Sequence, residues 1–126
     1  MEKLKNKVVL LVDDEERNTF ALGSYLETFD LKIEVAKNGE EALQMLNGET
    51  KADIILLDMM MPVMDGYETL EVLKQDDSLK TIPVIAVTAR AMKGDEEKCL
   101  ESGAWDYVSK PVNLKLLMDK INHWIL

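Results

Sequence analysis

The chain has 126 residues and a formal net charge of −9, and 47% of its residues are hydrophobic. This length and composition fit one domain with a buried core, and nothing indicates disorder. The negative charge argues against binding to nucleic acid or anionic membranes, because both require a basic surface. No apolar run approaches the roughly 18–20 residues of a membrane span. We therefore expect one cytoplasmic domain, residues 1–126.

Short apolar runs alternate along the chain with longer amphipathic segments. Runs 8–12, 54–57 and 82–87 are apolar throughout, as in strands covered on both faces, and 32–36 and 105–108 are shorter candidates. The segments expected to be helical are 15–29, 40–46, 66–75, 92–102 and the last one, which Asn113 caps. Helical spacing relates Phe20, Leu22, Tyr25, Leu26 and Phe29 in the first segment, and Leu114, Leu117, Ile121, Trp124 and Ile125 in the last.

Strict alternation of five strands with five helices predicts the α/β class. A parallel sheet needs crossover helices, and right-handed crossovers leave few arrangements. The leading candidate is a flavodoxin-like, doubly wound sheet of order 2-1-3-4-5 with helices on both faces.

Polar side chains follow four of the five expected strands. Asp13 and Asp14 come after the first strand, Asp58 after the third, Thr88 after the fourth and Lys110 shortly after the fifth. In a parallel sheet these positions share the carboxyl edge, where open α/β folds bind ligands. We therefore expect three carboxylates, a hydroxyl and an ammonium to meet in one shallow pocket.

Three adjacent carboxylates either share a proton or bind a cation. Because the ligands would all be oxygen, the sequence favours a hard cation such as Mg²⁺. Lys110 is a suitable phosphate partner, and Thr88 can donate a hydrogen bond to an added oxygen. Taken singly, each residue fits a surface charge or a cap, but together they favour phosphoryl transfer to Asp58.

Four motifs carry a resemblance that spans nearly the whole chain. They are Val12-Asp13-Asp14, the stretch Leu57 to Tyr67, Val87-Thr88-Ala89 and Ser109-Lys110-Pro111. They resemble the motifs of CheY-like receiver domains of two-component response regulators. The resemblance implies that Asp58 accepts a phosphoryl group from the phosphohistidine of a histidine kinase or a histidine phosphotransfer protein. It also implies a Mg²⁺ site, open to Mn²⁺ as well, formed by Asp13, Asp14, Asp58 and the backbone carbonyl of Met60.

The resemblance assigns further roles. Lys110 would pair with the phosphoryl group through a loop with a cis peptide bond to the following proline. Thr88 would hydrogen-bond the phosphoryl group, and Tyr107 would be the aromatic switch that turns inward. Met60 and Arg90 lie at positions that tune the loss of the phosphoryl group in the family.

The resemblance also implies a context. Residues 17–22 and 88–100 are similar to receivers of hybrid sensor kinases, so a membrane association would arise only within a larger kinase. The chain would carry no output domain, would not be an enzyme in its own right, and would signal through the helix after the fourth strand, the fifth strand and the last helix. A homodimer through that face is a further expectation, without nucleic acid or direct membrane contact.

Other interpretations remain open at this point. A flavodoxin-like cofactor binder would need a phosphate-binding loop where the sequence has Asp-Asp-Glu-Glu, and a phosphatase or a scaffold without phosphorylation would use the same fold. Tyr107 could be packing alone. We expect Met59, Met60 and Met61 to fill the loop and core, Cys99 to be a packed small side chain and His123 to lie on the surface.

Overall fold

The structure, a computed structural model, describes residues 2–61, 63–88 and 93–125. Its sheet consists of β1 (Val8–Val12), β2 (Lys32–Ala36), β3 (Ile54–Asp58), β4 (Val84–Thr88) and β5 (Asp106–Ser109). All neighbouring strands are parallel, in the order β2-β1-β3-β4-β5. The predicted doubly wound, flavodoxin-like topology is therefore confirmed.

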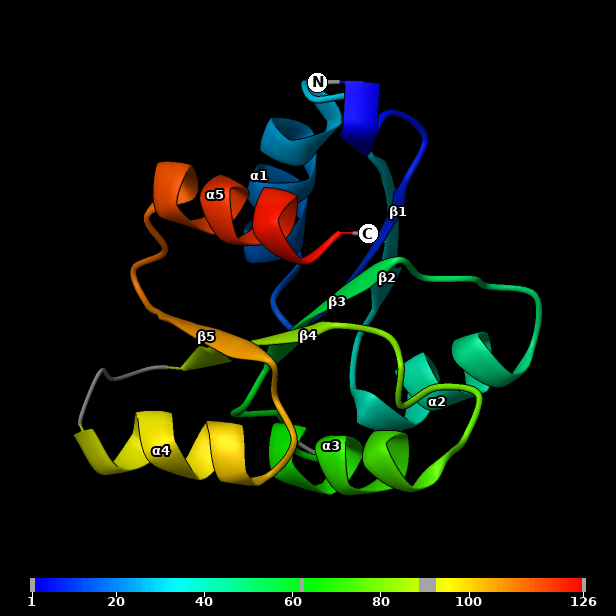
Figure 1. The fold of residues 1–126 in the computed structure, drawn as a ribbon, viewed down its shortest axis with the longest axis vertical. Coiled ribbons are helices and arrows are strands. Elements are labelled where there is room, and N and C mark those ends of the chain that lie inside the picture. Colours follow the sequence, from blue (N-terminus) through cyan, green and yellow to red (C-terminus); the bar gives the residue numbers. More distant parts are fainter. Residues whose placement is uncertain (1, 62, 89–92, 126) are drawn as a thin grey trace.

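Helices cover both faces of the sheet. They are α1 (Glu16–Glu27), α2 (Gly39–Asn47), α3 (Gly66–Gln75), α4 (Lys93–Glu101) and α5 (Leu114–Trp124), and a short 3-10 helix, η1 (Glu2–Leu4), precedes β1. Helices α1 and α5 lie on one face and α2, α3 and α4 on the other (Figure 1). No helix of the described residues has the length and apolar character to cross a membrane.

The core has two halves, one on each face of the sheet, because successive strand residues point to opposite sides. Leu10 and Val12 of β1 belong to the half beneath α2, α3 and α4. Val9 and Leu11 belong to the half beneath α1 and α5. This burial on both faces explains why the central strands are apolar throughout rather than alternating.

Local capping sets the start of three helices. The side chain of Asn38 accepts a hydrogen bond from the amide of Glu41 at the start of α2. Asp65 and Glu68 form a reciprocal capping box on α3. Asn113 caps α5, as predicted, by accepting from the Leu116 amide. The starts of these helices can be predicted from sequence, because each capping side chain bonds to an amide only three residues further along the chain.

Two expected details differ from the structure. Strand β4 begins at Val84 rather than at residue 82, because the Ile82 amide closes a turn on Leu79 and Pro83 offers only its carbonyl to β3. Helix α1 exposes 77% of Phe20, although its spacing placed it with the apolar residues. The rest of the predicted face is confirmed, because Leu26 is buried and Leu22, Tyr25 and Phe29 pack partly buried against the same core. Thr19 and Gly23 are buried as well, and their small side chains let the helix approach the sheet closely.

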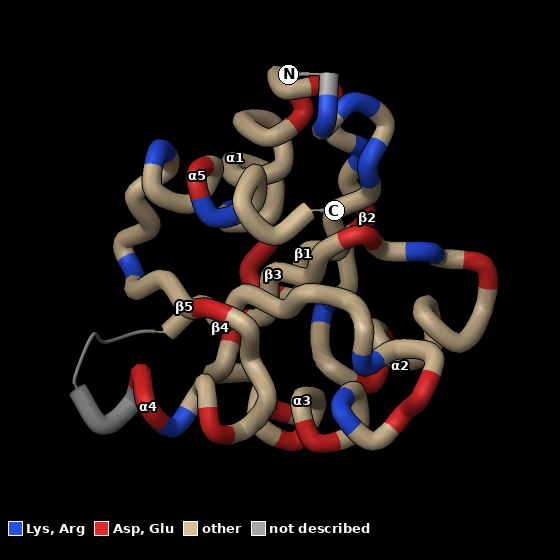
Figure 2. The backbone as a smooth tube through the Cα atoms, in the orientation of Figure 1, with Lys and Arg blue, Asp and Glu red and all other residues tan. Residues whose placement is uncertain are grey.

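The last helix also differs from expectation in two positions. Leu114 is 39% exposed, and Met118 takes a buried place on α5 that the predicted stripe did not include. Leu4, within the charged N-terminal segment, is fully buried and belongs to the core half beneath α1 and α5. Figure 2 shows basic residues around the N-terminal segment and acidic residues along α3, so the net negative charge is unevenly distributed.

Gly66 marks a close approach directly beside β3. A Cβ built on it would lie 2.6 Å from the Cα of Met59 and 3.0 Å from the carbonyl oxygen of Asp58, both in backbone that cannot rotate away. We expect Gly66→Ala to lower the free energy of unfolding by about 1–3 kcal/mol. Urea unfolding checks this. As a control, Gly23→Ala places its Cβ at ordinary contact distance from side chains and is expected to be neutral or stabilising. Equal effects at both positions would contradict the expectation.

Candidate functional site

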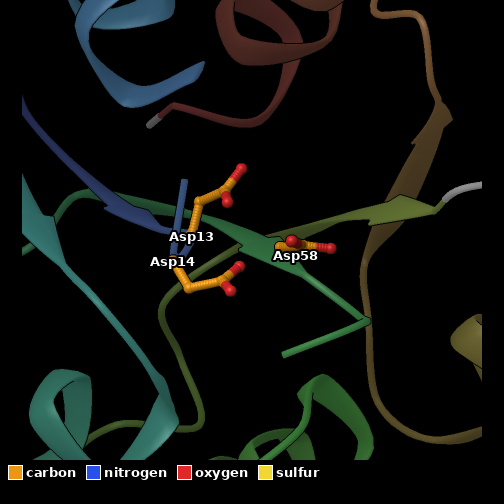
Figure 3. Close-up of side chains that lie close together, drawn as sticks. All are labelled: Asp13, Asp14 and Asp58. Atoms are coloured by element: carbon orange, nitrogen blue, oxygen red, sulfur yellow. The ribbon is translucent and has the colours of Figure 1, made fainter. Parts of the chain in front are cut away.

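The strand register brings three carboxylates together at the carboxyl edge of the sheet. Val12 of β1 pairs with Leu57 of β3, so that Asp13 comes level with Asp58. One oxygen from each of Asp13, Asp14 and Asp58 lies within 4.8 Å of the others (Figure 3). Asp58 is buried, Asp13 is half-buried and Asp14 is exposed. The structure thus brings together the three acids that the sequence predicted to meet.

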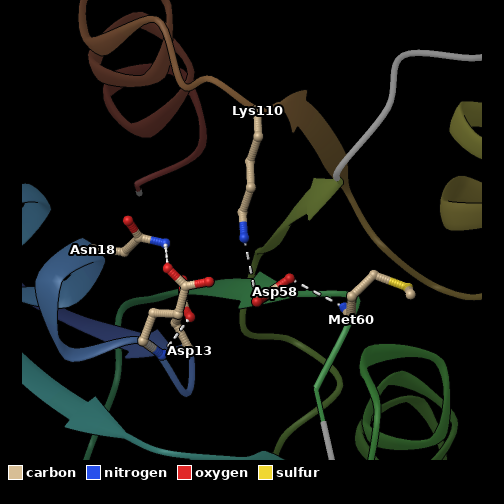
Figure 4. Close-up of polar contacts among 6 residues, drawn as sticks. Asp13, Asn18, Asp58, Met60 and Lys110 are labelled. Carbon is tan, nitrogen blue, oxygen red and sulfur yellow. Dashed lines mark hydrogen bonds and ion pairs between the residues drawn. The ribbon is translucent and has the colours of Figure 1, made fainter.

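Asp58 is the most enclosed of the three acids. It is the last residue of β3 and only 3% exposed. One carboxylate oxygen accepts the Met60 amide at 3.0 Å, and the other lies 3.4 Å from Nζ of Lys110 (Figure 4). One oxygen is thereby fixed by the backbone, while the other faces a cation from a different loop.

Burial raises the pKa of the Asp58 carboxyl above its usual value, and the nearby charge of Asp13 raises it further. The amide of Met60 and the ammonium of Lys110 act in the opposite direction but do not cancel the effect of burial. The site is therefore short of positive charge when no cation is bound. This is the electrostatic state that favours binding of a divalent ion.

This raised pKa predicts a stability effect. An acid whose pKa is higher in the folded than in the unfolded protein destabilises the fold as pH rises through the interval between the two values. In metal-free buffer at neutral pH, Asp58→Asn should therefore raise the free energy of unfolding. Urea unfolding with a chelator, at pH values from below the ordinary carboxyl pKa to neutrality, measures it. A variant less stable than the wild type at neutral pH would refute it. Asp119→Asn, at an exposed position on α5, is the control.

Thr88 ends the next strand, β4, and Lys110 follows β5, so that both lie at the same carboxyl edge of the sheet. Thr88 is 4% exposed and pairs in register with Ser109 of β5. The amide of Lys110 donates to the Thr88 carbonyl at 2.7 Å, which ties the lysine loop to the end of β4. The peptide bond between Lys110 and Pro111 is cis, as predicted.

Two residues at the edge of the site were not found from the sequence. The amide of Glu15 donates to Asp13 at 2.9 Å, and the Glu15 carboxylate accepts from the side chain of Asn18 at 3.0 Å. Figure 4 draws both contacts, with Asn18 and Asp13 labelled. The i, i+3 spacing of Glu15 and Asn18 at a helix start was the available signal.

A cavity of about 290 Å³ adjoins the acids. Its polar lining includes Asp13, Asp58 and Lys110, and its apolar lining comes from the ends of β1, β3 and β4, from α1 and from the segment that leads into α5, including Leu22 and Val112. The space beside Asp58 is therefore continuous with an apolar recess between α1 and the start of α5.

Tyr107 is half-buried in β5, and its hydroxyl donates to the Glu96 carboxylate at 3.0 Å. It therefore points toward α4. This hydrogen bond raises the pKa of Tyr107, with smaller contributions from burial and from the charges of Glu96 and Asp106.

The remaining expectations have mixed outcomes. Met59 and Met61 are buried and fill the core, whereas Met60 is 69% exposed and contributes its backbone. Cys99 is fully buried as expected, and His123 lies on the surface against Trp124. Arg90 lies outside the described residues.

Comparison with known proteins gives a consistent family. The sequence model of the response regulator receiver domain matches residues 9–122. The polar-differentiation response regulator DivK of Brucella anthropi is 39% identical over 94% of this chain and 96% of its own length. The hybrid signal transduction histidine kinase I of Dictyostelium discoideum is 41% identical over 90% of this chain, which spans only 7% of that kinase.

Solved structures agree with the sequence comparison. The receiver domain of the Saccharomyces cerevisiae response regulator Ssk1, solved with the histidine phosphotransfer protein Ypd1, has a TM-score of 0.88 and 31% identity, covering 97% of this chain and 90% of that one. The receiver domain of sensor histidine kinase PA1611 from Pseudomonas aeruginosa, with a magnesium ion in its active site cleft, has a TM-score of 0.83 and 30% identity, covering 95% and 98%.

Proposed function

Because the chain belongs to the response regulator receiver family of two-component signalling, we propose that its Asp58 carboxylate accepts a phosphoryl group from a phosphohistidine. The observation that carries this assignment is the position of Asp58, a buried carboxylate between two further carboxylates and an ammonium. A buried carboxylate in this setting suits a nucleophile better than a structural role, because Lys110 and a cation bound by the acids would neutralise the charge that phosphoryl transfer brings.

The donor set suits magnesium. Receiver domains bind Mg²⁺ at an acidic cluster of this kind, and the oxygen-only set of Asp13, Asp14 and Asp58 fits a hard cation that keeps some of its waters. We propose these three side chains and the Met60 carbonyl as the ligands, with Mn²⁺ as an alternative ion. The bound ion would neutralise charge on the carboxylates and on the phosphoryl oxygens.

The residues of the chain divide the work of transfer. An oxygen of Asp58 forms the new O–P bond as the P–N bond to the donor imidazole breaks, and the imidazole nitrogen keeps the electron pair. The Met60 amide holds one Asp58 oxygen in place, which orients the carboxylate. Lys110 stands beside the other oxygen and pairs with the charge of the phosphoryl group.

Phosphorylation supplies a signal because it adds charge and acceptor oxygens at one point. It brings roughly −1.5 to −2 charges, and Thr88 and Lys110 gain new partners only in that state. We propose that Thr88 moves to hydrogen-bond the phosphoryl group and that Tyr107 turns inward to follow it. The ligand thereby shifts a two-state equilibrium, and the face formed by α4, β5 and α5 carries the output.

The partners follow from the donor chemistry. Receiver domains act with histidine kinases or histidine phosphotransfer proteins, and we propose one of these as the phosphoryl source. Catalysis would be limited to the chain's own phosphorylation and dephosphorylation, so that it signals rather than turns over a substrate. A homodimer through the α4–β5–α5 face, cytoplasmic residence and the absence of nucleic-acid contacts are further proposals.

Incubation with acetyl phosphate and Mg²⁺ tests the proposal. We expect one phosphoryl group per chain, bound as a hydroxylamine-sensitive acyl phosphate and dependent on the divalent ion, with mass spectrometry of the intact protein as the measurement. Beryllofluoride with Mg²⁺ should produce the same conformational change without a covalent bond. Failure of both reagents to act on folded protein would overturn the proposed function. Bound flavin in the purified protein would instead favour a cofactor binder.

A further inference from the structure

Tyr107 is held from two sides in the resting structure. Its hydroxyl donates to Oε2 of Glu96 on α4 at 3.0 Å. Nζ of Lys120 on α5 lies 5.2 Å from the centre of its ring. Because the ring belongs to β5, one side chain links the central sheet to both helices that flank it.

Asp106 fixes the position of Lys120. Its carboxylate accepts from Nζ of Lys120 at 2.6 Å, from the indole of Trp124 at 2.9 Å and from the amide of Tyr107 at 2.8 Å. Burial acts to raise the pKa of Asp106, but these hydrogen bonds outweigh it, so that the pKa lies below its usual value. The contact between Lys120 of α5 and the Tyr107 ring is therefore held in place by several hydrogen bonds. On the α4 side, the described residues supply one hydrogen-bond partner for the Tyr107 hydroxyl, the Glu96 carboxylate.

The hydrogen bond between Tyr107 and Glu96 cannot persist if the ring turns inward. We propose that Glu96 is a positioning residue that holds Tyr107 in its resting orientation and thereby sets the threshold for switching. This inference rests on the proposed function, because it concerns how far phosphorylation of Asp58 must shift the equilibrium. Breaking the bond would also release the Glu96 carboxylate on α4 to the output face.

The size of the effect follows from the populations. The apparent affinity of a ligand that binds only the switched state equals its intrinsic affinity multiplied by the fraction of molecules already in that state. A larger switched fraction therefore gives tighter apparent binding. A hydrogen bond to a carboxylate at a half-exposed site contributes less than a buried one. Its removal should therefore tighten apparent beryllofluoride binding about three- to tenfold.

The experiment compares the wild type with Glu96→Ala and Glu96→Gln in a beryllofluoride titration with saturating Mg²⁺. The titration is followed by NMR of the β5 amides. Glu96→Ala should bind about three- to tenfold more tightly, and Glu96→Gln should lie between, because its amide oxygen still accepts the hydrogen bond. Glu97→Ala, at the adjacent exposed position on α4, is the matched control and should behave as the wild type.

A double-mutant cycle separates positioning from a general effect on α4. In a Tyr107→Phe background there is no hydroxyl to hold, so that Glu96→Ala should no longer change the affinity. The pKa of Tyr107, followed by NMR of labelled tyrosine, should fall toward its ordinary value in Glu96→Ala.

The outcomes distinguish the two proposals. If the wild type binds beryllofluoride but Glu96→Ala binds equally well, or if its effect persists in Tyr107→Phe, the inference about Glu96 is wrong and the proposed function stands. If the wild type does not bind beryllofluoride with Mg²⁺, the proposed function fails and the inference fails with it.

Discussion

Asp58→Asn is expected to lower phosphoryl incorporation from acetyl phosphate or a phosphohistidine donor by more than about 1,000-fold. The amide has nearly the shape of the carboxylate but lacks the anionic oxygen that forms the new bond to phosphorus. Radiolabelled phosphoryl transfer with saturating Mg²⁺ measures the effect as an initial rate.

The control for this experiment is Asp119→Asn, which removes the same charge from an exposed position on α5. It should be labelled at the rate of the wild type. Labelling of Asp58→Asn at the wild-type rate would show that another residue is the acceptor. The same variant is expected to be more stable than the wild type in metal-free buffer, so that a loss of labelling cannot be attributed to unfolding.

Asp13→Asn is expected to weaken Mg²⁺ binding about 10- to 100-fold. The three carboxylates attract the ion jointly, because one oxygen of each lies within 4.8 Å of the others. The loss of one charge therefore lowers the affinity of the whole site for the ion. Isothermal titration calorimetry measures the affinity. The rate of labelling at limiting Mg²⁺ should fall in parallel and should recover partly at high Mg²⁺.

Asp77→Asn is the matched control for this second experiment, because Asp77 is exposed and lies on the turn after α3. It should bind Mg²⁺ as the wild type does. Unchanged Mg²⁺ affinity in Asp13→Asn would contradict the assignment of the acid cluster as the metal site, whereas loss of affinity in both variants would indicate a diffuse effect of net charge.

The architecture was predictable because its signals are local or periodic. Apolar runs at 8–12 and 54–57 identify strands buried on both faces, and Asn113 identifies a helix start through a contact three residues away. The alternation of strands and helices then leaves few topologies. The boundaries of the elements were predicted less accurately. The observed start of β4 lies two residues after the predicted one, because Pro83 and the turn before it do not pair as strand residues.

One position of α1 was misplaced by the pattern of large apolar residues, although Leu22, Tyr25, Leu26 and Phe29 face the core as predicted. Phe20 is exposed while Gly23 is buried, because the helix approaches the sheet through its small residues. Whether a residue at the edge of a helix's apolar stripe is buried depends on the shape of the surface that the helix meets, and that surface is made of residues from the strands.

The sequence by itself determined the class of fold, the order of the strands and the presence of three acids, a threonine and a lysine at one edge, because strand ends in a parallel sheet share that edge. Only the tertiary structure decided how these groups contact one another. The burial of Asp58, its contact with Lys110 and the hydrogen bond from Tyr107 to Glu96 join side chains from different elements. Such contacts depend on side-chain packing in three dimensions, which no local pattern encodes.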